Sequence, residues 1–237
     1  MGVLVSTQPR QTLLDQAVYL MESGKPGLCV TPNAQMLHLA RRDACFRDFL
    51  NSADISLPDG AGTLLAANIL GKAPLEKIPG VEFGQDLCRE IAHRGLRLYL
   101  LGGKPGIAER AAENLRLQYP GLIICGCADG YFHSENAAAA ALSQSRPDCV
   151  FVCMGCPRQE EFIRRHRSSF GSALVLPLGG SLDIYAGTIS RAPRWMIRAN
   201  LEWLYRLLQQ PMRLRRMLFL PLFIVECYME KRKNKHG

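Results

Sequence analysis

The 237-residue sequence has no apolar stretch that approaches the roughly 20 residues a transmembrane helix needs. Its first residues, MGVLVSTQPRQTLLDQ, lack the basic start and apolar run of a secretory signal. Internal repeats and Gly/Ser-rich linkers are also missing, and the 48% hydrophobic and 21% charged residues exclude a disordered chain. We therefore expect a globular protein of the cytoplasm, long enough to bury a full core.

The sequence signatures of several enzyme classes are absent too. Without a GxxxxGK[ST] loop or a GxGxxG fingerprint, NTPases and dinucleotide-binding enzymes are disfavoured. The sequence also lacks the Asp-x-Asp pair with which many sugar-nucleotide transferases hold a metal on the diphosphate. A diphosphate would then be stabilised by helix N-termini and cationic side chains. We expect no metal and no cofactor.

Disulfide bonds are not expected either. The nine cysteines are an odd number, and several lie in apolar runs such as Cys149-Val-Phe-Val-Cys153, where a thiol behaves as a small hydrophobe. Cys153-Met-Gly-Cys156 has the spacing of a redox pair or zinc knuckle, but no second CxxC or HxxxH follows it. We predict buried structural thiols, with zinc binding as the weaker alternative.

The positive charge is concentrated at one end of the chain. Residues 191–237 contain eleven basic and three acidic side chains, an excess that equals the whole formal net charge of +8. Residues 1–190 are balanced. A segregated basic segment indicates a polyanionic partner, either nucleic acid or an anionic membrane surface.

Two helices are predicted in this basic segment, over residues 194–209 and 212–230. The second contains the aliphatic run 217–225 with cationic clusters on both sides, and it is too short to cross a hydrocarbon core of about 30 Å. This pattern favours a helix that lies on the membrane surface, and a helix packed on the core is the alternative. Nucleic acid is disfavoured because the cations do not interleave with stacking aromatics.

Short apolar runs alternate with helical segments through the first 190 residues. The runs predict strands at 28–30, 55–57, 96–101, 122–125, 149–154 and 173–178, and helices are expected at 12–23, 34–42, 60–71, 81–94, 106–118, 134–144 and 157–167. This alternation predicts an α/β fold with an open, mostly parallel Rossmann-like sheet and helices on both faces. Residues 1–190 would form this domain, and residues 191–237 a helical membrane-associating appendage.

Glycine-rich and polar segments follow most of the predicted strands. Ligands of open α/β sheets bind beyond the carboxyl ends of the strands, where glycine allows close approach and helix N-termini favour anions such as phosphate. The candidate ligand-binding residues at these ends are Thr31, Asn33, Asp59, Gly60, Gly102, Gly103, Gln159, Gly180 and Asp183.

The residues alone leave several roles open. Asp59 is either a general base or the N-cap of the helix that follows it. Thr31 and Asn33 are either ligand contacts or turn residues, and Asp183 either binds a hydroxyl group or caps a turn. Gln159 opens a helix, where capping is the usual role and ligand contact the less common one.

An ordered set of motifs, however, resembles a known family over nearly the whole chain: the TagA/WecG/CpsF glycosyltransferases. The motifs that carry the resemblance are Thr31-Pro-Asn-Ala-Gln35, Pro58-Asp-Gly-Ala-Gly62, Leu101-Gly-Gly103, Gly130-Tyr-Phe132, Gly155-Cys-Pro-Arg-Gln-Glu160, Gly179-Gly-Ser-Leu-Asp183, Ala186-Gly187, Arg191-Ala-Pro193, Leu201-Glu-Trp-Leu-Tyr-Arg206 and Gln210-Pro-Met-Arg213. No one of them is diagnostic, but the ordered set is specific.

The resemblance implies an inverting, metal-independent transferase that moves a sugar, often N-acetylmannosamine, from a UDP donor to a polyprenyl-diphosphate-linked acceptor. Such enzymes act in teichoic acid, common antigen or exopolysaccharide assembly. The resemblance also implies that Asp59 is the catalytic base, that Thr31 shares its pocket, and that the arginine-rich appendage docks on the membrane and completes the active site. The substrate-binding residues predicted in this way are Asn33, Gly60, Lys77, Glu82, Gly102, Gly103, Tyr131, Gln159, Gly180, Asp183, Arg206, Arg213 and Arg216.

Two of these positions depart from the family pattern. Lys77 and Glu82 stand where similar proteins tend to have arginine and aspartate, and lysine keeps the charge without the bidentate fork. Both are still expected to shape the pocket of an enzyme on the inner face of the membrane. The oligomeric state, a homo-oligomer included, stays open. The alternatives are a nonenzymatic nucleotide sensor of the same fold and a nucleic-acid-binding protein that uses the basic tail.

Overall fold

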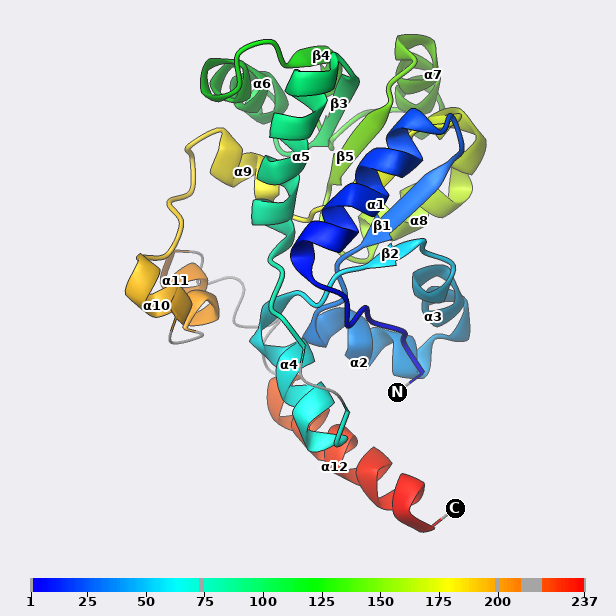
Figure 1. Cartoon of the computed structure of the whole chain (residues 1–237), viewed down its shortest axis with the longest axis vertical. Coiled ribbons are helices and arrows are strands. Elements are labelled where there is room, and N and C mark those ends of the chain that lie inside the picture. Colours follow the sequence, from blue (N-terminus) through cyan, green and yellow to red (C-terminus); the bar gives the residue numbers. More distant parts are fainter. Residues whose placement is uncertain (1, 73–74, 199–200, 210–218, 237) are drawn as a thin grey trace.

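The computed structural model describes residues 2–72, 75–198, 201–209 and 219–236. Within them, six strands form one open sheet in the order β2-β1-β6-β5-β3-β4, and every neighbouring pair is parallel. The strands are β1 (Gly27–Val30), β2 (Ile55–Ser56), β3 (Arg97–Gly102), β4 (Ile123–Ala128), β5 (Cys149–Cys153) and β6 (Leu174–Pro177). All six predicted strands are present, which confirms the predicted α/β sheet (Figure 1).

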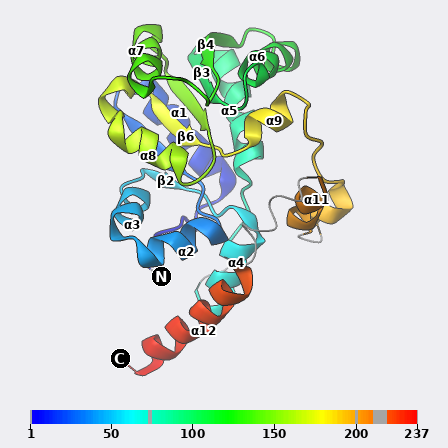
Figure 2. The same cartoon turned by 180° about the vertical axis from the view of Figure 1, so that it is seen from behind.

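Helices cover both faces of the sheet because alternate strand residues point to opposite sides (Figures 1 and 2). Leu98 and Leu100 of β3 pack in a core beneath α1 (Arg10–Glu22), α5 (Gly80–Arg94) and α6 (Ile107–Gln118). Tyr99 and Leu101 pack in a second core on the opposite face. Its helices are α2 (Ala34–Arg42), α3 (Ala44–Asn51), α7 (Glu135–Ser145), α8 (Arg158–Arg165) and the short 3-10 helix η1 (Arg167–Phe170).

Within the described residues, two α-helices were not predicted, α3 and α9 (Ser181–Tyr185), and neither was η1. Asp43 explains why α3 is hard to see in the sequence. It ends α2 and at the same time caps α3, because its Oδ1 accepts a hydrogen bond from the Phe46 amide at 3.0 Å. The two helices therefore follow one another without the Gly or Pro that usually marks a boundary.

The C-terminal segment contains three helices in its described part: α10 (Arg194–Arg198), α11 (Glu202–Gln209) and α12 (Leu220–His236). The single helix expected over 194–209 is therefore divided into α10 and α11. The described part of the second expected helix begins at Leu220, with Pro221 in its first turn, where proline is tolerated. It continues past the expected end at Glu230, since no glycine or proline follows in the helix.

One face of α12 packs on the rest of the protein. Phe223 and Cys227 are buried against Ala34 and Leu37 of α2 and against α4 (Gly60–Ile69). The helix therefore packs on α2 and α4. The alternative considered from the sequence was a helix packed on the core of the sheet, and the observed packing differs from it. None of the helices within the described ranges is long and apolar enough to cross a membrane.

Polar contacts add to this attachment. The buried Glu226 carboxylate lies 2.8 Å from His38 Nδ1 on α2 and 3.5 Å from an Arg42 guanidinium nitrogen. Arg41 forms an ion pair with Glu230 at 3.0 Å. The end of the chain is therefore fixed to α2 by charges as well as by apolar packing.

Candidate active site

A pocket of about 210 Å³ lies at the carboxyl ends of β1, β2 and β6. These strands are neighbours in the sheet, so the loops that follow them meet at one edge. Five predicted site residues line the pocket together: Thr31, Asn33, Asp59, Gly60 and Lys77. The other lining residues are Ala61, Pro79, Gly80, Val81, Leu178, Ser181 and Trp203.

Thr31 is the buried member of this group. It directly follows β1, and its hydroxyl donates a hydrogen bond of 3.4 Å to the Pro177 carbonyl at the end of β6. A Cβ atom added at Gly80 would lie 3.0 Å from Thr31 Cγ2, so the first turn of α5 approaches Thr31 closely. The pocket floor is therefore built by β1, β6 and α5 together.

Asp59 and Asn33 both occupy helix N-cap positions, but they use them differently. The Asn33 Oδ1 atom accepts hydrogen bonds from the Gln35 and Met36 amides, at 3.0 and 3.2 Å, and so caps α2. The Asp59 carboxylate makes no capping hydrogen bond to α4. Asp59 lines the pocket without the contact that would define an N-cap, whereas the turn role considered for Asn33 is present in the structure.

The pocket also offers groups suited to an anion. Lys77 lies in its lining, and so do the first residues of α4 and α5, Gly60 and Gly80. Helix N-termini carry partial positive charge and unpaired amide groups. A carboxylate that can accept a proton and groups that can stabilise a phosphate are thus collected in one cavity.

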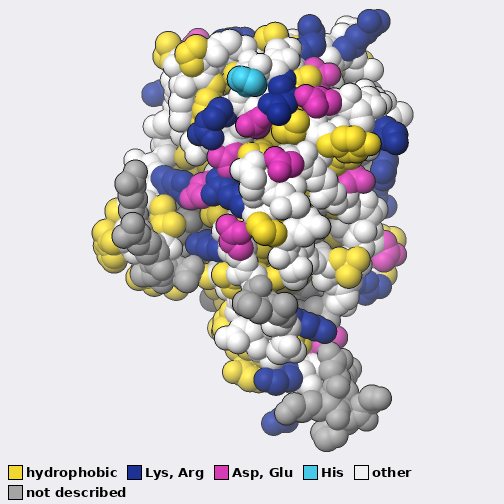
Figure 3. All heavy atoms as spheres, viewed as in Figure 1, with side chains coloured by type: hydrophobic (Ala, Val, Ile, Leu, Met, Phe, Trp, Pro, Cys, Tyr) yellow, Lys and Arg dark blue, Asp and Glu magenta, His cyan; other side chains and the backbone are white. Residues whose placement is uncertain are grey.

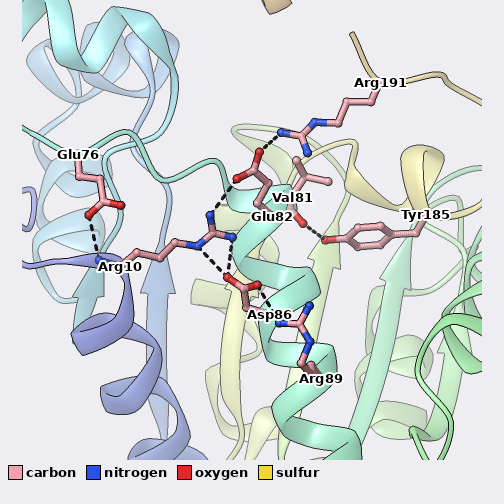
Figure 4. Close-up of polar contacts among 8 residues, drawn as sticks. All are labelled: Arg10, Glu76, Val81, Glu82, Asp86, Arg89, Tyr185 and Arg191. Atoms are coloured by element: carbon pink, nitrogen blue, oxygen red, sulfur yellow. Dashed lines mark hydrogen bonds and ion pairs between the residues drawn. The ribbon is translucent and has the colours of Figure 1, made fainter. Parts of the chain in front are cut away.

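Glu82 takes part in an ion-pair network beside the pocket (Figure 4). One carboxylate oxygen pairs with Arg191, and the other lies 3.0 Å from an Arg10 guanidinium nitrogen. Arg10 also reaches Asp86 at 2.6 Å. Burial by itself raises the pKa of Glu82, but the hydrogen bonds and charges of Arg191 and Arg10 outweigh it, so the pKa is lowered. The substrate-binding role predicted for Glu82 stays a prediction, and the contacts described link α1, α5 and the C-terminal segment.

Gln159 is buried and joins two loops. Its Oε1 atom accepts hydrogen bonds from the Gly155 amide at 3.2 Å and the Gly179 amide at 3.0 Å, and its Nε2 atom donates to Glu160 Oε1 at 2.7 Å. Burial raises the pKa of Glu160. These bonds hold the ends of β5 and β6 at a fixed separation. Contact of Gln159 with a substrate stays a prediction.

Three predicted residues lie at the other half of the same sheet edge: Gly102 ends β3, Gly103 follows it, and Tyr131 follows β4. A Cβ atom at Gly102 would lie only 2.2 Å from the Cys153 carbonyl oxygen, and φ there is +134°, so only glycine fits. The Gly130 amide donates to the Gly103 carbonyl oxygen at 2.8 Å, which joins the two loops. Arg158 lies over the exposed Tyr131 ring, 5.8 Å from its centroid.

The remaining predicted residues lie near α9 and in the C-terminal segment. Gly180 precedes α9, and Asp183 lies within it, where its carbonyl oxygen accepts a hydrogen bond from the Thr188 hydroxyl at 2.9 Å. Arg206 belongs to α11, and nothing is described of its side chain. Arg213 and Arg216 lie outside the described residues.

Sequence reasoning missed part of the lining. Ser181 and Trp203 belong to quoted motifs, Gly179-Gly-Ser-Leu-Asp183 and Leu201-Glu-Trp-Leu-Tyr-Arg206, but neither was assigned a role. Trp203 could not be placed in the pocket because it follows β6 by 26 residues of chain that had to fold back first.

The cysteines agree only in part with the prediction of buried structural thiols. None of the nine, which all lie in the described residues, forms a disulfide bond; Cys29, Cys88, Cys149, Cys153 and Cys227 are buried, Cys125, Cys127 and Cys156 are partly buried, and Cys45 is exposed. Burial raises the pKa of Cys88 and of Cys153 to about 12, which keeps both thiols protonated. Among the residues that the structure describes, no group of three or more His, Cys, Asp or Glu side chains is arranged to hold a metal ion.

Known proteins resemble this chain along most of its length. A model of the Glycosyl transferase WecG/TagA/CpsF family matches residues 1–237. A Bacillus subtilis protein named N-acetylglucosaminyldiphosphoundecaprenol N-acetyl-beta-D-mannosaminyltransferase is 34% identical over 86% of this chain and 80% of its own. A Bacillus spizizenii protein of the same name is 34% identical over 90% of this chain and 83% of its own. A Staphylococcus aureus protein of the same name is 33% identical over 87% of this chain and 81% of its own.

The family match agrees with the position of the motifs in the structure. The first two, Thr31-Pro-Asn-Ala-Gln35 and Pro58-Asp-Gly-Ala-Gly62, supply the side of the pocket that holds the carboxylate. With a family model matched along the whole chain and relatives aligned over most of their length, the chain belongs to the WecG/TagA/CpsF family of glycosyltransferases.

Proposed function

We propose that this glycosyltransferase moves an N-acetylmannosaminyl residue, or a closely related sugar, from a UDP donor to N-acetylglucosamine on a polyprenyl diphosphate. The names of the relatives support this donor sugar and acceptor. The observation that carries the proposal is the pocket in which Asp59, Thr31 and Lys77 meet. The product would enter a cell-surface polysaccharide such as teichoic acid or an exopolysaccharide. The nonenzymatic sensor considered from the sequence does not agree with membership of an enzyme family.

In the proposed mechanism Asp59 removes the proton from the acceptor hydroxyl group. The hydroxyl oxygen attacks the anomeric carbon from the face opposite UDP, the bond to the diphosphate breaks, and UDP leaves with the electron pair. One displacement inverts the anomeric carbon. The relatives are named for a β-linked product, which a single displacement would give from an α-linked UDP sugar. This chemistry needs one base, and general-base catalysis contributes roughly 10²–10⁴-fold.

Lys77 and the N-termini of α4 and α5 would stabilise the leaving diphosphate without a metal ion. The other predicted residues at this sheet edge would contact the donor or the acceptor: Asn33, Gly60, Gly102, Gly103, Tyr131, Gln159, Gly180 and Asp183. Arg206, Arg213 and Arg216 would add positive charge from the C-terminal segment.

The test is the Asp59→Asn variant assayed on a water-soluble acceptor, a short prenyl diphosphate that carries N-acetylglucosamine. We expect a loss of turnover of roughly 10²–10⁴-fold with UDP binding retained, because the amide keeps the shape but cannot accept the proton. Asp48→Asn, the same change on an exposed side chain of α3, is the matched control. If Asp59→Asn keeps more than about a tenth of the turnover, Asp59 is not the base.

We further propose that the C-terminal segment places the enzyme on an anionic membrane at the cytoplasmic face. On α12 the buried Phe223 and Cys227 face α2 and α4, while Leu222, Val225 and Met229 remain exposed on the other side. Trp195 and Leu208 of α10 and α11 are exposed as well, in a region where Figure 3 shows hydrophobic side chains at the surface. An apolar surface next to a basic segment is typical of interfacial binding.

Vesicle flotation tests this location. Changing Arg213, Arg215 and Arg216 together to glutamine should weaken binding to anionic vesicles about 100-fold, since each cation near the surface contributes about 1 kcal/mol. The loss should shrink at high salt. Binding that is unchanged in this variant and in Val225→Ser would refute the membrane role of the segment.

A further inference from the structure

Trp203 is a wall of the active-site pocket, although it lies far along the chain from the other lining residues. It is carried by α11 and lines the pocket with Thr31, Asp59 and Ser181. Its side chain keeps 45% of its surface exposed. Of the twelve lining residues described, it is the one aromatic. A large ring in the lining of a pocket that also holds Asp59 and Lys77 offers a flat apolar surface to whatever enters.

The C-terminal segment that carries Trp203 is attached next to the pocket. Arg191, which begins it, pairs with Glu82, and Glu82 directly follows the lining residue Val81 on α5 (Figure 4). Ala192 and Met196 are buried. The Tyr185 hydroxyl, a few residues earlier, donates to the Val81 carbonyl oxygen at 2.8 Å. Arg191 therefore attaches the start of the segment to the first turn of α5, beside the pocket that Trp203 lines.

The chemistry of the lining suggests what the ring contacts. A hexosamine has hydroxyl and amide groups around its rim and a ring face formed largely by C–H bonds. Asp59, Thr31 and Lys77 can serve the polar rim and the phosphate. The apolar ring face and the acetyl methyl group need an apolar partner, and an indole provides a large, rigid one with few rotatable bonds.

We propose that Trp203 stacks on the N-acetylglucosamine ring of the lipid-linked acceptor; this inference rests on the proposed function. The acceptor, rather than the donor, is favoured by the position of α11. The same segment exposes Trp195 and Leu208, the surface that would face the membrane, and the acceptor's lipid must extend toward that surface. The water-soluble donor has no such requirement. Trp203 thus positions the acceptor hydroxyl beside Asp59.

Kinetics on the soluble acceptor test this role without membrane binding. In Trp203→Ala the KM of the acceptor should rise about tenfold while the KM of the donor stays within about twofold, and Trp203→Phe should recover most of the loss because it keeps an aromatic face. Tyr19→Ala is the control, since Tyr19 is an aromatic residue of α1 that is 63% exposed and does not line the pocket. An unchanged acceptor KM in Trp203→Ala, or a rise confined to the donor, would overturn the proposal.

A direct binding measurement uses the fact that the chain has only two tryptophans. In Trp195→Phe all tryptophan emission comes from Trp203, so the soluble acceptor should shift or quench it in a saturable way, and UDP alone should not. This readout does not depend on turnover: if the wild-type protein transfers no sugar, the proposed function fails, whereas the emission still reports acceptor binding. Transfer by the wild-type protein with no emission change would refute the role of Trp203 alone. Quenching by brominated lipid but not by acceptor would place the ring in the bilayer instead.

Discussion

Replacing Phe223 with alanine should detach α12 while leaving the sheet intact. Phe223 is only 1% exposed and packs in a small cluster with residues of α2 and α4, separate from the two cores that cover the sheet. A buried Phe→Ala change costs about 3–5 kcal/mol. Because α12 contacts helices rather than strands, this cost falls on its docking equilibrium, and the undocked population should rise about 150- to 5,000-fold.

Hydrogen exchange followed by mass spectrometry measures this change. Peptides of α12 should exchange about 150- to 5,000-fold faster in Phe223→Ala, up to the unprotected rate, while peptides of β3 and β5 keep their protection. Val225→Ala is the matched control, because Val225 is on the same helix but 52% exposed. If the strands lose protection as much as α12, or if α12 is unaffected, then Phe223 does not act as the local anchor inferred here.

Three further outcomes are expected. Glu82→Gln should lower the free energy of unfolding at neutral pH. Because Arg191 and Arg10 lower the pKa of Glu82 below its ordinary 4.5, the difference in stability should disappear as the pH falls through the lowered pKa. Urea denaturation at neutral pH and at a pH below the lowered pKa would show this. Turnover should survive EDTA, given the lack of an Asp-x-Asp pair, and activity lost to EDTA and restored by magnesium or manganese would contradict this. Cys45, the exposed cysteine, should react first with iodoacetamide in the folded protein, and peptide mass spectrometry should find buried Cys88, with its pKa near 12, unmodified.

The sheet could be predicted from the sequence because parallel strands covered on both faces must be apolar throughout. The run Cys149–Cys153 is buried at every position, and it was visible as a continuous apolar segment. The strand order was not predictable in the same way. Pairing of β1 with β6 joins residues almost 150 positions apart, and it depends on how the helices fill both faces rather than on any local pattern.

The pocket was predictable to the extent that it depends on strand ends. Thr31 and Asp59 follow neighbouring parallel strands, so the topology alone brings them together. The roles of Gln159 and Glu82 were harder to predict from the sequence. A polar side chain suggests ligand contact, but Gln159 hydrogen-bonds two loops and Glu82 forms ion pairs. Trp203 was beyond prediction since its place depends on the path of the chain after β6.

The two attachments of the C-terminal segment explain why catalysis and membrane binding would be linked in this enzyme. One attachment, Arg191 with Glu82, is on α5, and the other, around Phe223, is on α2 and α4. All three of these helices begin at the pocket, where Asn33 caps α2 and Asp59 precedes α4. Detachment of the segment would therefore act on α4, which directly follows Asp59, the proposed base. A variant that detaches α12, such as Phe223→Ala, should accordingly reduce turnover on the soluble acceptor as well as vesicle binding, whereas a purely passive anchor would lose only the latter.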